Sequence, residues 1–192
     1  MKRRLALLLL ASVPLSGCGY NRIQTLDEQA NKAQGQIEVQ LQRRAELIPN
    51  LVSTVKGYAT HEQEVFTKVA EARAGLLNAV QSHDPEQMAN ANNQMNSVLG
   101  RLLAVAEAYP QLKADQSFLR LQDELTGTEN RIAVARTDYN QAVNDYNAYI
   151  RTFPTLVTAK VTGAHPRKYF AASPGATQAP TVDFSKPATK SP

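Results

Sequence analysis

The stretch that decides the fold is residues 118–153, FLRLQDELTGTENRIAVARTDYNQAVNDYNAYIRTF. Apolar, aromatic or small side chains recur in it at alternating steps of three and four residues, without a slip. This spacing places one continuous stripe along one face of an α-helix. A stripe of this length is typical of a bundle or coiled-coil seam. The seam consists of Phe118, Leu121, Leu125, Thr128, Ile132, Ala135, Tyr139, Ala142, Tyr146, Tyr149 and Phe153.

Working outward from this seam, the same periodicity predicts four helices. Their expected ranges are residues 22–59, 61–80, 85–109 and 115–153. Asp84-Pro85 gives the strongest start signal, because Asp is a good N-cap and Pro suits the first helical position. Pro49 lacks the backbone donor for the Ala45 carbonyl, so a kink is expected there. No segment alternates with a period of two, which predicts an all-α fold without a sheet.

The helix lengths favour one topology. At 1.5 Å per residue the outer helices are about 57 and 58 Å long, and the inner ones about 30 and 37 Å. Short loops make sequential helices antiparallel. We therefore predict an elongated antiparallel up-down four-helix bundle with long first and last helices, kinked at Pro49. A single rod over residues 22–80 is the less favoured alternative, because part of its apolar stripe would lack a partner.

The beginning of the chain predicts export and lipidation. Residues 1–17 combine three basic residues with an apolar run that is too short for a stable membrane-spanning helix, as in a signal peptide. Leu15-Ser16-Gly17-Cys18 resembles the bacterial lipobox, in which the Cys is acylated and becomes the new N-terminus. Several acyl chains anchor a protein stably. By resemblance to diderm lipoproteins, Gly19 rather than Asp after Cys18 implies the outer membrane facing the periplasm, with the inner membrane as the alternative. An ordinary cleaved signal peptide with an incidental Cys is the competing interpretation.

Charge and composition exclude several classes of function. The formal charge of +4 falls to about +1 once residues 1–17 are removed, which argues against a nucleic-acid partner. Cys18 is the only cysteine, so neither a disulfide framework nor a Cys-built zinc site can form within one chain. His61-Glu62 starts a zincin-like pattern, but Val65 stands where a second His is needed. We therefore expect no metal, no cofactor and no enzyme activity.

Two polar constellations stand out in the helices. Arg44, Pro49 and Asn50 surround the expected kink, where Arg43 or Arg44 and Asn50 could donate to the freed Ala45 carbonyl. This group is interpreted as a structural clamp, with a partner-binding notch as the alternative. Tyr139-Asn140 and Tyr146-Asn147 repeat at seven residues, which places the tyrosines on the seam and the asparagines beside it. Core packing with hydrogen bonds at the rim is favoured over ligand binding.

The C-terminal part divides into two segments. Residues 154–170 keep apolar residues and carry three cations, Lys160, Arg167 and Lys168, without an acid. They are predicted either to work at the membrane surface or to form a strap on the bundle with solvated cations. Residues 171–192 contain little besides Ala, Ser, Thr and Pro and are expected to be a disordered tail.

Several of these motifs together resemble the LemA family over residues 20–170. The resemblance rests on Tyr20-Asn21, Arg44, Leu47-Ile48-Pro49-Asn50-Leu51-Val52, Val55-Lys56-Gly57-Tyr58, His61-Glu62, Ala72-Arg73, Arg136, Tyr139-Asn140, Val143, Tyr146-Asn147, Phe153-Pro154, Ala159, Gly163 and Phe170. It implies a helical bundle (residues 22–153) anchored in a bacterial membrane, here through residues 18–21 as a lipidated N-terminus and short linker. A lipobox replaces the uncleaved N-terminal membrane helix that is more common in the family.

The resemblance also implies a class of function. We expect a membrane-anchored, non-enzymatic interaction or scaffold lipoprotein of the cell envelope, with envelope protein partners and a link to membrane proteolysis or envelope upkeep. Two alternatives from other classes stay open: a metal-dependent envelope hydrolase around His61 and Glu62, and a carrier with an apolar groove between helices.

Overall fold

The computed structural model describes the backbone of residues 2–170 and the side chains of residues 19–170. Within this part the chain is helical, without strands. The helices are α1 (Lys2–Lys56), α2 (Gln63–Ser82), α3 (Pro85–Glu107), α4 (Pro110–Lys113), α5 (Gln116–Arg151) and α6 (Thr155–Thr162). The predicted tail, residues 171–192, lies outside the described residues. The predicted all-α class is confirmed.

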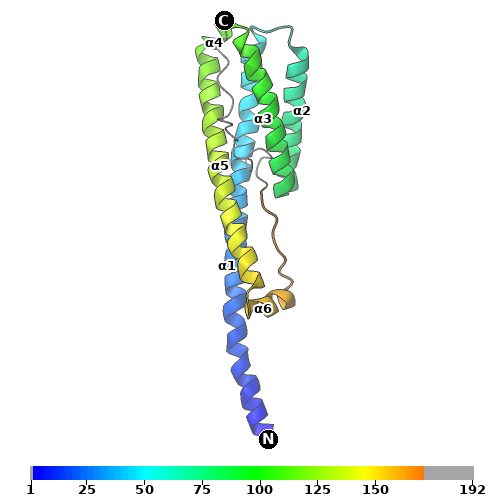
Figure 1. Ribbon diagram of the computed structural model, residues 1–192, viewed down its shortest axis with the longest axis vertical. Coiled ribbons are helices and arrows are strands. Elements are labelled where there is room, and N and C mark those ends of the chain that lie inside the picture. Colours follow the sequence, from blue (N-terminus) through cyan, green and yellow to red (C-terminus); the bar gives the residue numbers. More distant parts are fainter. Residues whose placement is uncertain (1, 171–192) are drawn as a thin grey trace, which may run out of the picture.

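The long helices α1 and α5 lie side by side as an antiparallel pair and form the axis of the molecule (Figure 1). The α2–α3 hairpin packs on the part of α1 remote from its N-terminus. Helix α5 packs broadly on α1, whereas it contacts α3 only locally and lines with it a crevice of about 290 Å³. These contacts describe a helix pair that carries a hairpin, and they do not establish the predicted elongated up-down four-helix bundle.

The predicted helix boundaries need three corrections. Helix α1 begins at Lys2, so residues 18–21 are helical and do not form a linker. It continues through Pro49, as the predicted range of residues 22–59 requires, but it ends at Lys56 rather than at residue 59. Residues 154–170 are not a uniform segment, because they contain α6 followed by an extended stretch. The break expected between the ranges 22–59 and 61–80 is confirmed, and it extends over residues 57–62, which no helix covers.

The ends of the helices follow local chemistry. Asp84 caps α3 as predicted, because its carboxylate accepts the backbone N–H groups of Glu86 and Gln87 at 2.9 and 3.3 Å. Asp115 caps α5 in the same way through Ser117 and Phe118. Such caps satisfy backbone donors that have no partner within the helix.

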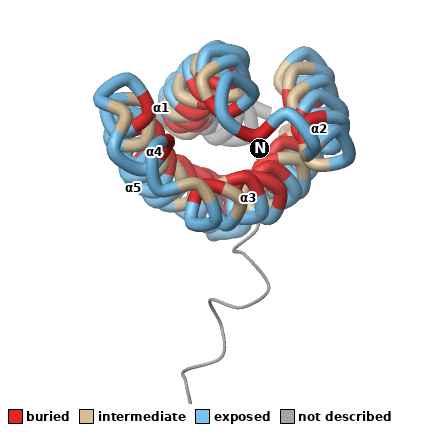
Figure 2. The backbone as a smooth tube through the Cα atoms, turned by 90° about the horizontal axis from the view of Figure 1, so that it is seen from above, coloured by how far each residue is buried: buried red, intermediate tan, exposed pale blue. Residues whose placement is uncertain are grey.

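The core occupies the inward faces of the helices (Figure 2). A large cluster joins α1, α2, α3 and α5, and a smaller one lies nearer the N-terminus of α1. In the smaller cluster Ile23 and Leu26 of α1 meet Tyr146 and Ile150 of α5. The predicted seam is therefore wrong at its end, because Ile150 is buried although it is not a seam residue, whereas the seam residue Phe153 is 80% exposed.

Candidate functional site

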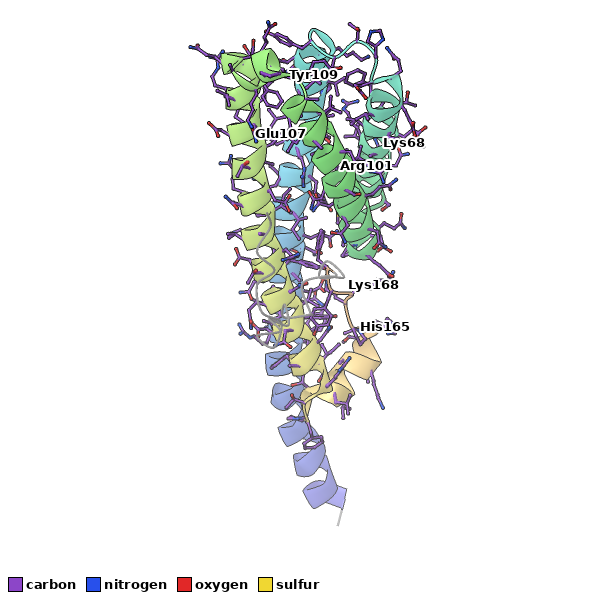
Figure 3. The ribbon with its side chains drawn as sticks, turned by 45° about the horizontal axis from the view of Figure 1, so that its top comes forward. Lys68, Arg101, Glu107, Tyr109, His165 and Lys168 are labelled. Atoms are coloured by element: carbon purple, nitrogen blue, oxygen red, sulfur yellow. The ribbon has the colours of Figure 1, made fainter. Side chains whose placement is uncertain are left out.

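The most elaborate polar site joins the extended stretch after α6, residues 164–170, to α5. We call this stretch the strap. It runs from α6 back along the α1–α5 pair towards the turn between α2 and α3 (Figure 1). Figure 3 shows His165 close to α6 and Lys168 near the lower end of α3. The strap therefore connects α6 to the lower end of the α2–α3 hairpin.

Two asparagines of α5 hold the backbone of the strap. Asn147 accepts the N–H of Arg167 at 2.8 Å and donates to its carbonyl at 3.0 Å. Asn140 does the same for Phe170, at 2.9 and 3.0 Å. The hydroxyl of Tyr139 donates to the carbonyl of Lys168 at 2.8 Å. The seven-residue repeat of the sequence thus places the tyrosines in the core and turns the asparagines towards the C-terminal strap.

Two basic side chains of the strap form ion pairs with acidic residues elsewhere in the chain. Arg167 donates from Nε to Asp27 Oδ1 at 2.7 Å and lies 5.8 Å from the centre of the Tyr146 ring. Lys168 donates to Asp84 Oδ2 at 2.8 Å and lies 3.6 Å from Glu86. The sequence places no acid in residues 154–170, but folding supplies three from distant positions.

These ion pairs shift the pKa values of their members. The hydrogen bond from Lys168 lowers the pKa of Asp84, and the bond to Asp84 raises the pKa of Lys168. The hydrogen bond to Asp27 raises the pKa of Arg167. The structure therefore pairs two of the three cations that the sequence suggested for a membrane surface, whereas Lys160 is exposed on α6.

A second polar site surrounds Arg44 in the core. Only 4% of this residue is exposed, and its guanidinium donates to Asn92 Oδ1 at 2.7 Å, to Asn96 and to Glu129. Asn96 also donates to Glu129 at 3.3 Å, which joins α1, α3 and α5 in one network. Burial lowers the pKa of Arg44, and Glu129 partly offsets this effect. Among the described residues, the Nε of Arg44 has no hydrogen-bond partner, and it is inaccessible to solvent.

The predicted partners of the Ala45 carbonyl were wrong. Arg73 of α2 donates to this oxygen from Nε at 2.8 Å, across the interface between two helices. Arg44 points instead into the core network, and Asn50 is exposed with its backbone carbonyl accepting from Thr54. Pro49 itself is exposed. It leaves the carbonyl of Ala45 free to accept from α2, and its own ring does not occupy the core.

Several residues of these sites were not identified from the sequence. Asn92 was detectable, because it interrupts the apolar stripe of α3 between Met88 and Met95. Asp27 and Glu129 gave no such signal, since each sits among other polar residues in the sequence. The packing of α1 against its neighbours places Asp27 beside Arg167 and Glu129 beside Arg44.

Among the described residues, the structure brings no further metal-ligating side chains to His61 and Glu62, the residues of the hydrolase alternative. His61 is exposed in the turn before α2, beside the half-buried Glu62. Within residues 19–170 no three His, Cys, Asp or Glu side chains are grouped so that they could hold a metal ion. The carrier alternative corresponds to an open groove of about 650 Å³ between α1 and α5, lined mainly by apolar atoms, with Ala33, Val134 and Ala135 along it.

Exposed apolar residues gather at the α6 end. Phe153 and Val161 are 80% and 82% exposed, and Leu156 and Val157 are exposed beside them. Gly19 lies against this helix, because a Cβ built on it would be 3.6 Å from Thr158 Oγ1 and 3.8 Å from a Thr155 methyl. The residue that follows Cys18 is therefore in contact with α6. Across the described helices, none has the length and apolar character needed to cross a membrane.

Comparison with known proteins agrees with the resemblance in the sequence. Residues 33–184 match the profile of the LemA family. The match thus extends into the predicted tail. Among curated proteins, the magnetosome protein MamQ 2 of Paramagnetospirillum magneticum is 29% identical over 178 residues, which cover 81% of this chain.

Two other relatives are more distant. MamQ of Magnetospirillum gryphiswaldense is 27% identical over 81% of this chain, and Protein LemA of Metamycoplasma hominis is 26% identical over 73%. This chain spans 65% of the length of the two MamQ proteins and 63% of that of Protein LemA, slightly less than two thirds in each case.

Proposed function

The chain belongs to the LemA family, and from this premise we propose that it is a lipid-anchored, non-enzymatic scaffold or interaction protein of the bacterial cell envelope. Cys18 carries the acyl chains, and the helical body presents surfaces to protein partners. The proposed link to membrane proteolysis or envelope upkeep comes from the family resemblance. Outer-membrane attachment facing the periplasm is favoured by Gly19 at the position after Cys18.

One observation carries this proposal: Gly19 lies against α6, whose neighbourhood exposes several large apolar side chains. The residue next to the proposed acylation site and this apolar surface therefore share one end of the described structure. Apolar side chains at that level can enter the interfacial region of a bilayer. Lys160 of α6 adds a cation that favours an anionic surface.

The length of α1 then sets how far the body stands from the membrane. The carbonyl of His83, in the turn between α2 and α3, accepts a hydrogen bond from Gln34 at 2.8 Å. Gln34 follows Cys18 by 16 residues, or about 24 Å of helix, and α1 ends at Lys56, about 57 Å from Cys18. The hairpin would therefore be held in the aqueous compartment, where a partner protein can reach it.

Replacing the anchoring residue tests this function. Cys18→Ser should abolish palmitate labelling and leave an uncleaved or soluble protein in membrane fractionation. Ser16→Ala is the matched control, because a small residue is kept in the lipobox and labelling should persist. Labelling that survives Cys18→Ser would reject the lipid anchor.

The two alternatives have their own measurements. Stoichiometric metal in the purified protein, lost on Glu62→Gln, would favour the hydrolase. Saturable binding of a fluorescent apolar probe, lost on Val134→Lys in the groove between α1 and α5, would favour the carrier. A protein without metal and without probe binding leaves the scaffold as the proposed function.

A further inference from the structure

The contacts between α5 and the strap are directed almost entirely at the strap's main chain. Five hydrogen bonds reach backbone atoms of Arg167, Lys168 and Phe170, and all five involve side chains of Tyr139, Asn140 or Asn147. A carboxamide carries both donors and an acceptor, so one asparagine can pair with the N–H and the C=O of the same residue. Each asparagine thus contacts the strap much as a neighbouring β-strand would.

The spacing of the two asparagines matches an extended chain. Asn140 and Asn147 are seven helical residues apart, which corresponds to about 10.5 Å along α5. Arg167 and Phe170 are three residues apart, and an extended chain covers at most about 10 Å in that number. The helix therefore presents its amides at the repeat that an antiparallel extended peptide requires, whatever side chains that peptide carries.

The four strap residues 167–170 define four positions of the site, and side-chain contacts at three of them add selectivity. The first position is basic, because Arg167 meets Asp27 and the ring of Tyr146. The second is basic, because Lys168 meets Asp84 and Glu86. The third is open, because Tyr169 is exposed. The fourth is aromatic, because Phe170 is 2% exposed and belongs to the main core cluster.

We propose that this face of α5, with Asp27 and Asp84 beside it, is a peptide-binding site for extended segments of the pattern basic–basic–any–aromatic. Residues 167–170 are its resident occupant, and a segment of this chemistry from an envelope partner protein exchanges with them. Gly163, with φ of 73°, lies between α6 and the strap, so the exchange can pivot at a glycine without moving α6. This inference names the partner chemistry of the proposed scaffold.

The site is tested with a labelled peptide, Ala-His-Pro-Arg-Lys-Tyr-Phe, and the full-length chain in detergent. Phe170→Ala loosens the resident strap, so fluorescence anisotropy should show saturable binding to this variant at least roughly tenfold tighter than to the wild type. Adding Asn147→Ala should weaken binding roughly tenfold. Adding Asn144→Ala is the matched control, because Asn144 is an exposed asparagine of the same helix, and binding should not change.

A change in the peptide keeps the test valid if Asn147→Ala disturbs folding. N-methylation of the peptide nitrogen at the Arg position removes the donor that Asn147 accepts, and it should weaken binding by roughly tenfold. Binding that ignores both N-methylation and Asn147→Ala would overturn the proposal, as would no binding to Phe170→Ala. If the wild type forms dimers that the peptide dissociates, a second copy of this chain is the occupant, and the proposal of a different partner protein is overturned. None of these measurements depends on acylation of Cys18, so the proposed anchor and the peptide site can fail separately.

Discussion

Arg73 on α2 donates a hydrogen bond from Nε to the carbonyl oxygen of Ala45 on α1, four residues before Pro49. Pro49 cannot satisfy this carbonyl, because it lacks the N–H that an α-helix would supply at that position. The proline thus creates an acceptor on α1, and the arginine joins that acceptor to α2. The relationship explains how α1 keeps its helix through Pro49 while α2 gains a fixed register.

A double-mutant cycle measures this pairing. Arg73→Ala should lower the free energy of unfolding by about 1–2 kcal/mol, because a partly buried carbonyl loses its donor. In a Pro49→Ala background the same change should cost less, since the substituted residue supplies a backbone N–H to that carbonyl. Urea denaturation of the four proteins gives the coupling free energy. Equal costs of Arg73→Ala in both backgrounds would contradict the pairing.

Arg44 should contribute more to the free energy of unfolding than Asn50, the other polar residue near Pro49. Arg44→Ala removes the cation shared by Asn92, Asn96 and Glu129 and leaves a cavity, so we expect a loss of about 2–4 kcal/mol in urea denaturation. Asn50→Ala should change stability by less than about 0.5 kcal/mol, because Asn50 is exposed. A large loss from Asn50→Ala, or none from Arg44→Ala, would show that the network is not a stabilising clamp.

Alkaline pH should loosen the strap contact of Tyr139. Burial raises the pKa of this phenol from 10.0 to about 12, so folding favours its neutral form. Its contribution to stability is complete below pH 10 and is lost as the pH rises through 12. Near-ultraviolet absorbance titration should show late tyrosinate ionisation whose amplitude falls in Tyr139→Phe and is unchanged in Tyr169→Phe, because burial also raises the pKa of Tyr146. Late ionisation of unchanged amplitude in Tyr139→Phe would argue against this origin.

The apolar residues around α6 should promote membrane binding without the acyl anchor. For the chain starting at Gly19, replacing both Val157 and Val161 with Glu should weaken co-sedimentation with anionic vesicles at least roughly tenfold, because two apolar contacts with the interface are lost. Val134→Glu is the control, since Val134 is 62% exposed on α5, a different helix. Equal loss in the control would indicate a general charge effect rather than an α6 surface.

Local sequence patterns were enough to predict the four main helices and most of their buried faces, but not α4, α6 or the exposure of Phe153. The stripe from Phe118 to Tyr146 is a local property, because side chains three and four residues apart necessarily share one face of a helix. The cap at Asp84 and the break near Gly57 are local for the same reason: a few adjacent residues decide where backbone donors find partners. These features were therefore predictable without knowing which helix packs on which.

The pairing of polar side chains between helices depends on the tertiary structure and could not be predicted from the sequence. Arg167 and Asp27 are 140 residues apart in sequence, and Arg44 and Glu129 are 85 apart, so no spacing rule could pair them. The repeat at Asn140 and Asn147 was visible, but its ligand was not, because the strap reaches it only after α6 reverses the chain. Hydrogen bonds act over about 3 Å, and the positions of these donors and acceptors are set by the packing of whole helices.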